Sequence, residues 1–210
     1  MKSRLVVIAG MLAALAAPAA RAQEAAPTLQ EDPRAAKFRD VEHGLFVGFE
    51  VGGLRLLDTP TADTAKHAYA GTGGGAANGV QIGLHVGFDF GKWVAVSAFA
   101  LGANEQASSK DYGAFSLYAG GLDVRVSPVS FKDRNGWDRL FVYGHVRYGQ
   151  GLTRPKGLLG DAEAVLAGGP GIEYFTRLRH FSVGLAADYV RVMKAGVSGV
   201  AVYPTVRYTF

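Results

Sequence analysis

A strict two-residue alternation of side chains is the feature that most limits how this chain can fold. The segment "GVQIGLHVGFDF", Gly79–Phe90, places six apolar side chains on one face and glycines with Gln81, His85 and Asp89 on the other. A helix with 3.6 residues per turn would scatter both sets around its axis, whereas a strand separates them. The segment is therefore predicted to be a strand with one apolar face.

The same alternation recurs along most of the chain, and no segment has the pattern of an amphipathic helix. The predicted strands cover residues 44–55, 79–90, 93–101, 112–126, 140–150, 163–175, 181–192 and 199–210, the sixth being interrupted by "GGPG". An even number of antiparallel strands that closes on itself leaves no exposed edge. We expect an all-β, eight-stranded antiparallel up-and-down barrel.

Alternation alone does not say which face is inside. A soluble barrel would hold the apolar face inward, whereas a transmembrane barrel turns it to lipid and keeps the polar face in the lumen. The non-apolar face here is mostly glycine with isolated charges, and aromatic residues gather near both predicted ends. Such aromatic girdles mark membrane interfaces. The sequence therefore favours a transmembrane β-barrel with periplasmic N- and C-termini.

The connections between the predicted strands alternate in length. Longer, polar connections include Leu56–Asn78, and tight turns include Gly91–Lys92. Outer-membrane barrels show this asymmetry, with long external loops and short periplasmic turns. The exception is Ser127–Arg139, a predicted periplasmic turn of thirteen residues that carries Phe131 and Trp137.

The first 22 residues have the pattern of a cleaved signal peptide. Lys2 and Arg4 precede an apolar run, Leu5–Ala17, and small residues lead to cleavage near Ala22. Residues 23–42 are expected to be a flexible periplasmic lead-in, and 43–210 the barrel. Removal of three cations and no acid lowers the net charge from +4 to +1, which gives no basis for nucleic-acid binding. The absence of cysteine excludes disulfides, thiolate metal sites and lipoprotein anchoring.

The last residues, "VRYTF", place Val206, Tyr208 and Phe210 at alternating positions. This pattern resembles the terminal assembly signal of outer-membrane β-barrel proteins, which implies recognition by the barrel-assembly machinery. The chain from residue 23 on resembles the small eight-stranded barrels of the OmpX and OmpA-barrel type. In size and Gly/Ala-rich strands it is also similar to barrel proteins of adventurous gliding motility machineries, of the CglE type. That second resemblance implies a non-catalytic envelope component with a role in adhesion.

An eight-stranded barrel is only wide enough for its own side chains to fill. Charges inside it are costly unless they are paired. We therefore predict a luminal ion-pair network formed by the inward-facing residues Glu50, His85, Asp89, Asp123, Arg125, His145, Arg147, Glu173, Asp188 and Arg207. A proton or ion path through the same residues is the alternative.

Catalysis and metal binding have weaker support in the sequence. A lipid-modifying enzyme would need a nucleophile and a histidine base within hydrogen-bond reach, and no serine is clearly placed beside a histidine. A metal site at His85 and His145 lacks a third ligand fixed by the sequence. We predict no catalytic residues, no cofactor and no metal.

The remaining candidates are residues in connections, where binding usually resides. Tyr69, Phe131 and Trp137 are the predicted partner contacts. The function predicted from the sequence is a structural or interaction component of an outer-membrane complex. A narrow pore for ions or small solutes is the alternative, and a lipid-modifying enzyme a more distant one.

Overall fold

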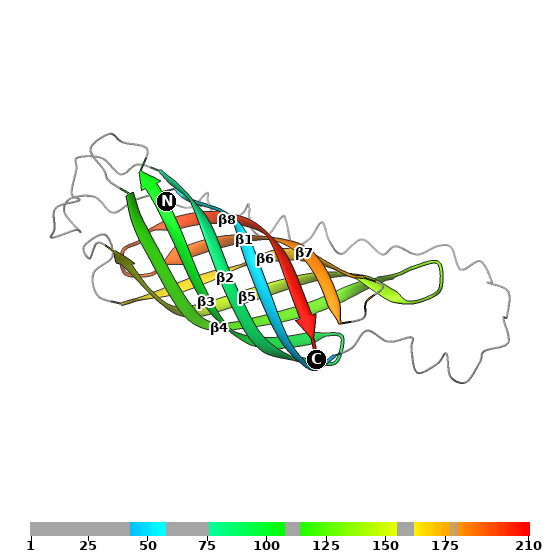
Figure 1. Ribbon diagram of the computed structural model, residues 1–210. Helices are drawn as coiled ribbons and strands as arrows, with labels where there is room; N and C mark the ends of the chain where they lie inside the picture. The colour runs from blue at the N-terminus through cyan, green and yellow to red at the C-terminus, as the bar shows by residue number, and fades with distance from the viewer. Residues whose placement is uncertain (1–42, 58–75, 108–113, 155–161, 177, 179) are drawn as a thin grey trace, which may run out of the picture. The chain divides into compact units, whose positions relative to one another are not determined.

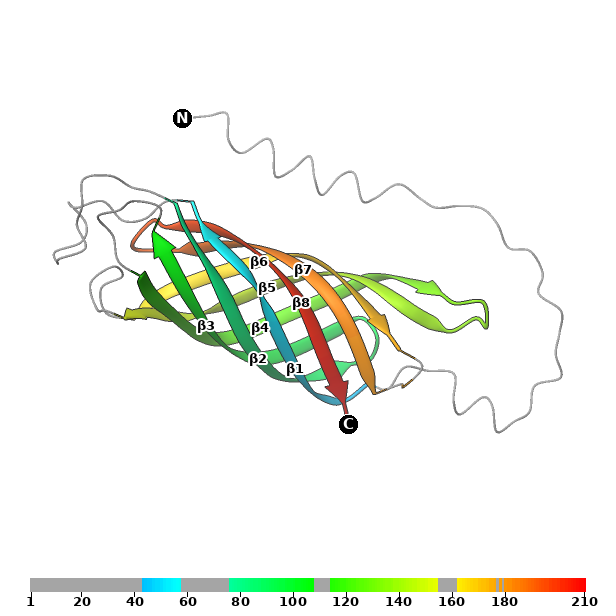
Figure 2. The same ribbon diagram turned by 45° about the horizontal axis from the view of Figure 1, so that its top comes forward.

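The computed structural model describes residues 43–57, 76–107, 114–154, 162–176, 178 and 180–210, which form a β-barrel (Figures 1 and 2). Its strands are β1 (Leu45–Leu56), β2 (Ala77–Phe90), β3 (Val94–Ala107), β4 (Ala114–Lys132), β5 (Asp138–Arg154), β6 (Glu163–Phe175), β7 (Phe181–Val192) and β8 (Ser198–Thr209). Each strand pairs antiparallel with the next, and β8 pairs with β1, so the barrel is closed. The predicted all-β, eight-stranded antiparallel barrel is confirmed. In the part of the chain described, no helix has the length and apolar character needed to cross a membrane.

We call the end of the barrel where β1 begins and β8 finishes the terminal end, and the opposite end the distal end. The turns β2–β3, β4–β5 and β6–β7 lie at the terminal end, because the strands are antiparallel and consecutive. The predicted signal peptide, the lead-in and most of the connection 56–78 lie outside the described residues.

The outer face of the barrel is apolar, as the alternation predicts. On β2, for example, Val80, Ile82, Leu84, Val86, Phe88 and Phe90 are all exposed, while Gln81 and Asp89 are buried. Such a band of exposed apolar side chains on every side of a closed barrel suits lipid rather than water. The orientation deduced from composition, apolar outward and polar inward, therefore agrees with the burial pattern.

The structure corrects the prediction for residues 127–139. Instead of a thirteen-residue turn, β4 and β5 continue as a paired hairpin whose strands are joined by residues 133–137 (Figures 1 and 2). β3 begins only at Val94, which pairs with Val126, so β4 continues beyond its neighbour. The register of the β4–β5 pair shifts between Val126 and Val129, an irregularity typical of a β-bulge. We call Ser127–Arg139 the projecting hairpin.

Other strand boundaries differ from the predictions where small residues hide the alternation. β3 continues through "LGANEQA" to Ala107, six residues past its predicted end, and β5 continues to Arg154. β6 has its predicted limits despite "GGPG". Its pairing with β7 passes from Gly168 to Gly171 and omits Gly169 and Pro170, as expected for a proline that has no N–H to contribute to the ladder.

The distal half of the lumen contains a hydrophobic core, which the sequence analysis did not predict. We call it the apolar cluster; its members include Leu54, Leu56, Phe115, Leu117, Val165, Val190, Val192 and Tyr203. Leu54 and Leu56 follow Glu50 at even spacing on β1, so they share its inward face. The lumen is therefore polar toward the terminal end and apolar toward the distal end.

Candidate functional site: the barrel lumen and the projecting hairpin

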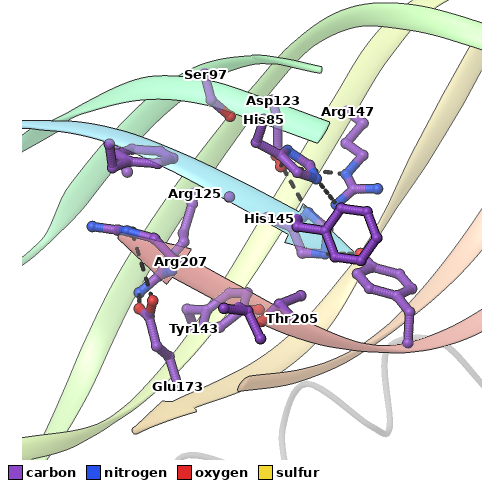
Figure 3. Close-up of a pocket in the computed structure, with 16 residues that line it drawn as sticks. His85, Ser97, Asp123, Arg125, Tyr143, His145, Arg147, Glu173, Thr205 and Arg207 are labelled. Atoms are coloured by element: carbon purple, nitrogen blue, oxygen red, sulfur yellow. Dashed lines mark hydrogen bonds and ion pairs between the residues drawn. The ribbon is translucent and has the colours of Figure 1, made fainter. Parts of the chain in front are cut away.

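The polar half of the lumen contains all ten charged residues singled out in the sequence, and the structure brings them into two groups. Figure 3 labels His85, Asp123, Arg125, His145, Arg147, Glu173 and Arg207 among them. The central cluster consists of Glu50, His85, Asp123, His145, Arg147 and Asp188, with Tyr203. The terminal cluster consists of Asp89, Arg125, Glu173 and Arg207, with Ser182.

Arg147 is the hub of the central cluster. Its Nη1 and Nη2 donate to the two carboxylate oxygens of Glu50 at 3.0 and 2.7 Å, a bidentate pair between β5 and β1. Its Nε donates to Asp123 at 3.3 Å, and its Nη1 lies 3.7 Å from Asp188. Bidentate arginine–carboxylate pairs are among the stronger hydrogen-bonded ion pairs. One guanidinium therefore links carboxylates from three other strands.

Two imidazoles complete the central cluster. His85 Nε2 lies 2.6 Å from Glu50 Oε2, and His145 lies 3.3 Å from Asp123 through Nδ1 and 2.8 Å from Asp188 through Nε2. With three carboxylates and one guanidinium, the cluster is neutral only when both imidazoles carry a proton. The Tyr203 hydroxyl donates to Asp188 at 2.9 Å, so that carboxylate is also anchored from β8.

The terminal cluster pairs charges one to one. Arg125 bonds Glu173, and Arg207 bonds Asp89. Ser182 donates to Glu173 at 2.6 Å. The two guanidinium groups also lie over aromatic faces, Arg125 at 4.0 Å from the Tyr143 ring and Arg207 at 3.9 Å from the ring of Phe46. Two cations and two anions make this group formally neutral.

A cavity of about 60 Å³ lies between the two clusters, with His85, Asp123, Arg125, Arg147 and Arg207 among its lining residues (Figure 3). A buried water needs roughly 10–15 Å³ of such volume and two to four polar partners. The cavity therefore has room for a few waters among charged groups. Toward the distal end, members of the apolar cluster line a smaller space of about 30 Å³ together with other residues that include Gln81, Arg147 and Asp188.

Glycine makes room for the long luminal side chains. A Cβ atom on Gly83 would lie 2.7 Å from the Glu50 side chain, and one on Gly171 would lie 2.3 Å from the ring of Tyr143. Both distances are shorter than a van der Waals contact. At these positions the inward glycines accommodate a glutamate and a tyrosine from the neighbouring strand.

Several buried polar residues were not singled out from the sequence. Tyr143, Tyr203 and Ser182 lie on inward faces that alternation identifies, but their role as hydrogen-bonding or ring partners depends on register between strands. Glu105 was assigned to a loop and instead lies in β3, 1% exposed, with both carboxylate oxygens lacking a hydrogen-bond partner. Its neighbours across β2 and β4 are Gly79 and Phe115.

The geometry offers little for catalysis or metal binding. Within the described residues, no group of three or more His, Cys, Asp or Glu side chains is arranged to hold a metal ion. The two luminal imidazoles contact carboxylates, Arg147 and Tyr203, and neither has a serine hydroxyl as a hydrogen-bond partner in the same part of the chain.

The projecting hairpin is held by a dense set of contacts. The backbone N–H groups of Asn135 and Trp137 donate to Asp133 Oδ1 at 2.8 and 3.0 Å, which lowers the pKa of the Asp133 carboxyl, the Trp137 bond contributing most. Arg139 donates to Asp133 Oδ2 at 3.2 Å and to the carbonyl of Thr176. The turn is therefore tied both to itself and to the β6–β7 connection.

The predicted partner contacts have different environments. Phe131 is 49% exposed, whereas Trp137 is partly covered by the guanidinium of Arg139, 4.8 Å from its ring. Tyr69 lies outside the described residues. The outward residues Val206, Tyr208 and Phe210 are all exposed on the apolar face, at the closure of β8 on β1.

Comparison with known proteins finds likeness at the level of fold. No protein-family model matches the chain, and no curated protein matches it. The solved structure of Neisserial surface protein A (NspA) is 13% identical, covers 80% of this chain and 97% of its own, and superposes with a TM-score of 0.59. The outer membrane protein OprG from Pseudomonas aeruginosa is 14% identical, covers 82% and 99%, and has a TM-score of 0.50.

A third structure, the attachment invasion locus protein Ail of Yersinia pestis, is 12% identical over 80% of this chain and all of its own, with a TM-score of 0.46. At these identities the likeness concerns architecture alone. The chain has the eight-stranded closed antiparallel barrel fold found in outer-membrane proteins of Gram-negative bacteria.

Proposed function

We propose that this protein is a non-catalytic outer-membrane β-barrel that serves as a structural and interaction component of an envelope complex. The observation that carries the proposal is the filled lumen. Two charged clusters occupy its polar half and the apolar cluster its distal half. A barrel whose interior is occupied in this way leaves the ends and the projecting hairpin as the surfaces available for function.

The outer membrane is the proposed location, with the terminal end in the periplasm. The exposed apolar band on the outer face and the architecture shared with NspA and OprG support this placement. A periplasmic terminal end also agrees with the usual arrangement of short periplasmic turns and longer external loops. The projecting hairpin would then extend into the periplasm.

A narrow pore is the second candidate, and the cavity between the two clusters is the observation that favours it. Conductance in planar bilayers tests this candidate. We expect no conductance from the wild-type protein, because the apolar side chains that fill much of the distal half do not replace the hydration of an ion. Steady single-channel currents would favour the pore over the structural role.

Crosslinking in intact cells tests the interaction role. A photoreactive residue at Trp137 or Tyr69 is expected to capture discrete protein partners, whereas the same residue at Leu84, on the apolar outer face, is expected to capture lipid. If position 137 captures only lipid and assembly machinery, the proposal fails. Partners from a motility apparatus would support the narrower role in adventurous gliding and adhesion, which rests on resemblance in size and strand composition.

A further inference from the structure

The projecting hairpin has a free strand edge. From Val129 to Lys132, β4 pairs only with β5, because β3 begins at Val94 opposite Val126. The last backbone bond on the β3 side joins the Ser127 N–H to the Trp93 carbonyl at 2.8 Å. Beyond that point, the outer edge of β4 has no strand partner among the described residues, as the hairpin in Figures 1 and 2 illustrates.

This edge lies beyond the start of β3. Phe131 lies five positions after Val126, which at roughly 3.3 Å per residue is about 16 Å along the strand. Val129 and Phe131 are nevertheless 41% and 49% exposed. An exposed strand edge with apolar side chains is a template for pairing with another extended chain. Pro128 lacks an N–H, which limits pairing to the segment that follows it.

The hairpin is also held rigidly, so little ordering would be required on binding. Lys92, in the β2–β3 turn, lies 3.5 Å from Asp138, and the Ser130 hydroxyl donates to the same carboxylate at 3.0 Å. The Asp133–Arg139 pair and the bonds from Arg139 to the β6–β7 connection fix the other strand. A preorganised edge loses less conformational entropy when a partner docks.

The charges of the hairpin indicate the chemistry of the partner. Both of its carboxylates are paired, Asp133 with Arg139 of the hairpin and Asp138 with Lys92 of the β2–β3 turn. The remaining cations, Lys132 and Arg134, are exposed and have no carboxylate partner in the described part of the chain. The free charge beside the edge is therefore positive.

We propose that the free edge of β4, Val129–Lys132, binds an extended acidic segment of a partner protein by strand addition. Backbone hydrogen bonds to the edge would supply affinity, and Val129 and Phe131 would contact alternate side chains of the added strand. Lys132 and Arg134 would select acidic residues beside it. This inference rests on the proposed interaction role and specifies where and how the partner docks.

The test is a selection of random ten-residue displayed peptides on the full chain in discs of zwitterionic lipid. We expect the enriched peptides to be acidic and rich in β-branched residues. When bound, they should slow amide hydrogen exchange at residues 129–132 at least tenfold. The variant Lys132→Glu/Arg134→Glu should lose at least tenfold in affinity. The control Arg154→Glu/Lys194→Glu makes the same charge change at exposed positions of the distal end and should bind like the wild type.

Three outcomes would overturn the inference: no enrichment, enriched peptides whose binding survives the charge reversal at 132 and 134, or binding without slower exchange at 129–132. Slower exchange in discs of anionic phosphatidylglycerol without peptide would identify a lipid surface as the occupant and overturn it as well. If crosslinking at Trp137 captures partners while this test fails, the interaction role stands and only docking at the strand edge is wrong.

Discussion

The two halves of the lumen fill the same narrow space with opposite chemistry. The polar half connects strands through ion pairs centred on Arg147, whereas the distal half packs aliphatic and aromatic side chains. In the polar half nearly every charge has an opposite charge beside it, and in the distal half Glu105 is buried without a hydrogen-bond partner. A charge is thus stabilising or costly according to the half in which it lies.

The largest expected effect comes from breaking the hub of the central cluster. Arg147→Ala leaves Glu50, Asp123 and Asp188 without their shared guanidinium, and removing one partner of a buried pair costs about 3–5 kcal/mol. We expect the free energy of unfolding to fall by that amount. It is measured in a urea titration, in which the gel mobility that distinguishes folded from heated protein reports the folded fraction. If Arg147→Ala and Asp123→Ala both left the heat stability of the barrel unchanged, the ion-pair network would be contradicted.

A smaller loss is expected in the apolar half. Leu54→Ala removes a side chain that is 3% exposed, and such truncations cost about 2–4 kcal/mol through lost burial and the cavity left behind. The same urea titration measures it, with Val200→Ala on the outer face as the matched control because Val200 is 41% exposed. Equal losses at positions 54 and 200 would argue that the apolar cluster does not pack as described.

Glu105→Met sharpens the contrast, because it is expected to stabilise the barrel. Replacing a buried carboxylate that lacks hydrogen bonds with an apolar side chain of similar size removes a penalty of about 1–3 kcal/mol. Glu50→Met is the matched control and is expected to destabilise, since it leaves Arg147 without its bidentate partner. If both substitutions shift stability in the same direction, the two halves do not differ in the way proposed.

The smallest effect concerns the hairpin outside the lumen. Hydrogen bonds from the backbone N–H groups of Trp137 and Asn135 lower the pKa of Asp133. A lowered pKa stabilises the hairpin above the unfolded pKa of the carboxyl, and this stabilisation is lost as pH falls through the folded pKa. Acidification should therefore lower the amide protection factors of residues 133–137, each exchange rate being compared with the intrinsic rate at the same pH. Asp133→Asn should remove most of that dependence.

Alternation predicted most of the fold, because the two-residue period of side chains along a strand does not depend on the neighbouring strands. It predicted the inward positions of Glu50, His145 and Arg207 and the limits of β6 and β7. It could not predict which inward charges meet, because that depends on how far each strand is staggered around the closed barrel. For the same reason Glu50 and Arg147, on β1 and β5, could be listed but not paired.

The regions predicted wrongly share a different cause. In "LGANEQA", small and polar residues make the two faces alike, so the end of β3 was missed and Glu105 was placed in a loop. In the projecting hairpin, Pro128 and the Asn135–Gly136 pair suggest a long irregular turn. In the structure the Asn135–Gly136 pair marks only the tip of the hairpin. The apolar cluster was not predicted, because the inward face was identified by its charges and Leu56 was assigned to the connection after the strand. Leu54 has the inward parity of Glu50 but carries no charge to mark it.

Two luminal ion pairs have a consequence for the order of folding events. Arg147 and Glu50 are 97 residues apart in the chain, and Arg207 and Asp89 are 118 apart. Neither pair joins neighbouring strands, so neither can form from a single hairpin. Contacts between residues so far apart in the chain form late, because pairing of neighbouring strands must first reduce the entropy cost of closing the loop between them. These two pairs are therefore expected to form after pairs between neighbouring strands, such as His85–Glu50 and Arg147–Asp123, and to stabilise the barrel once it has closed.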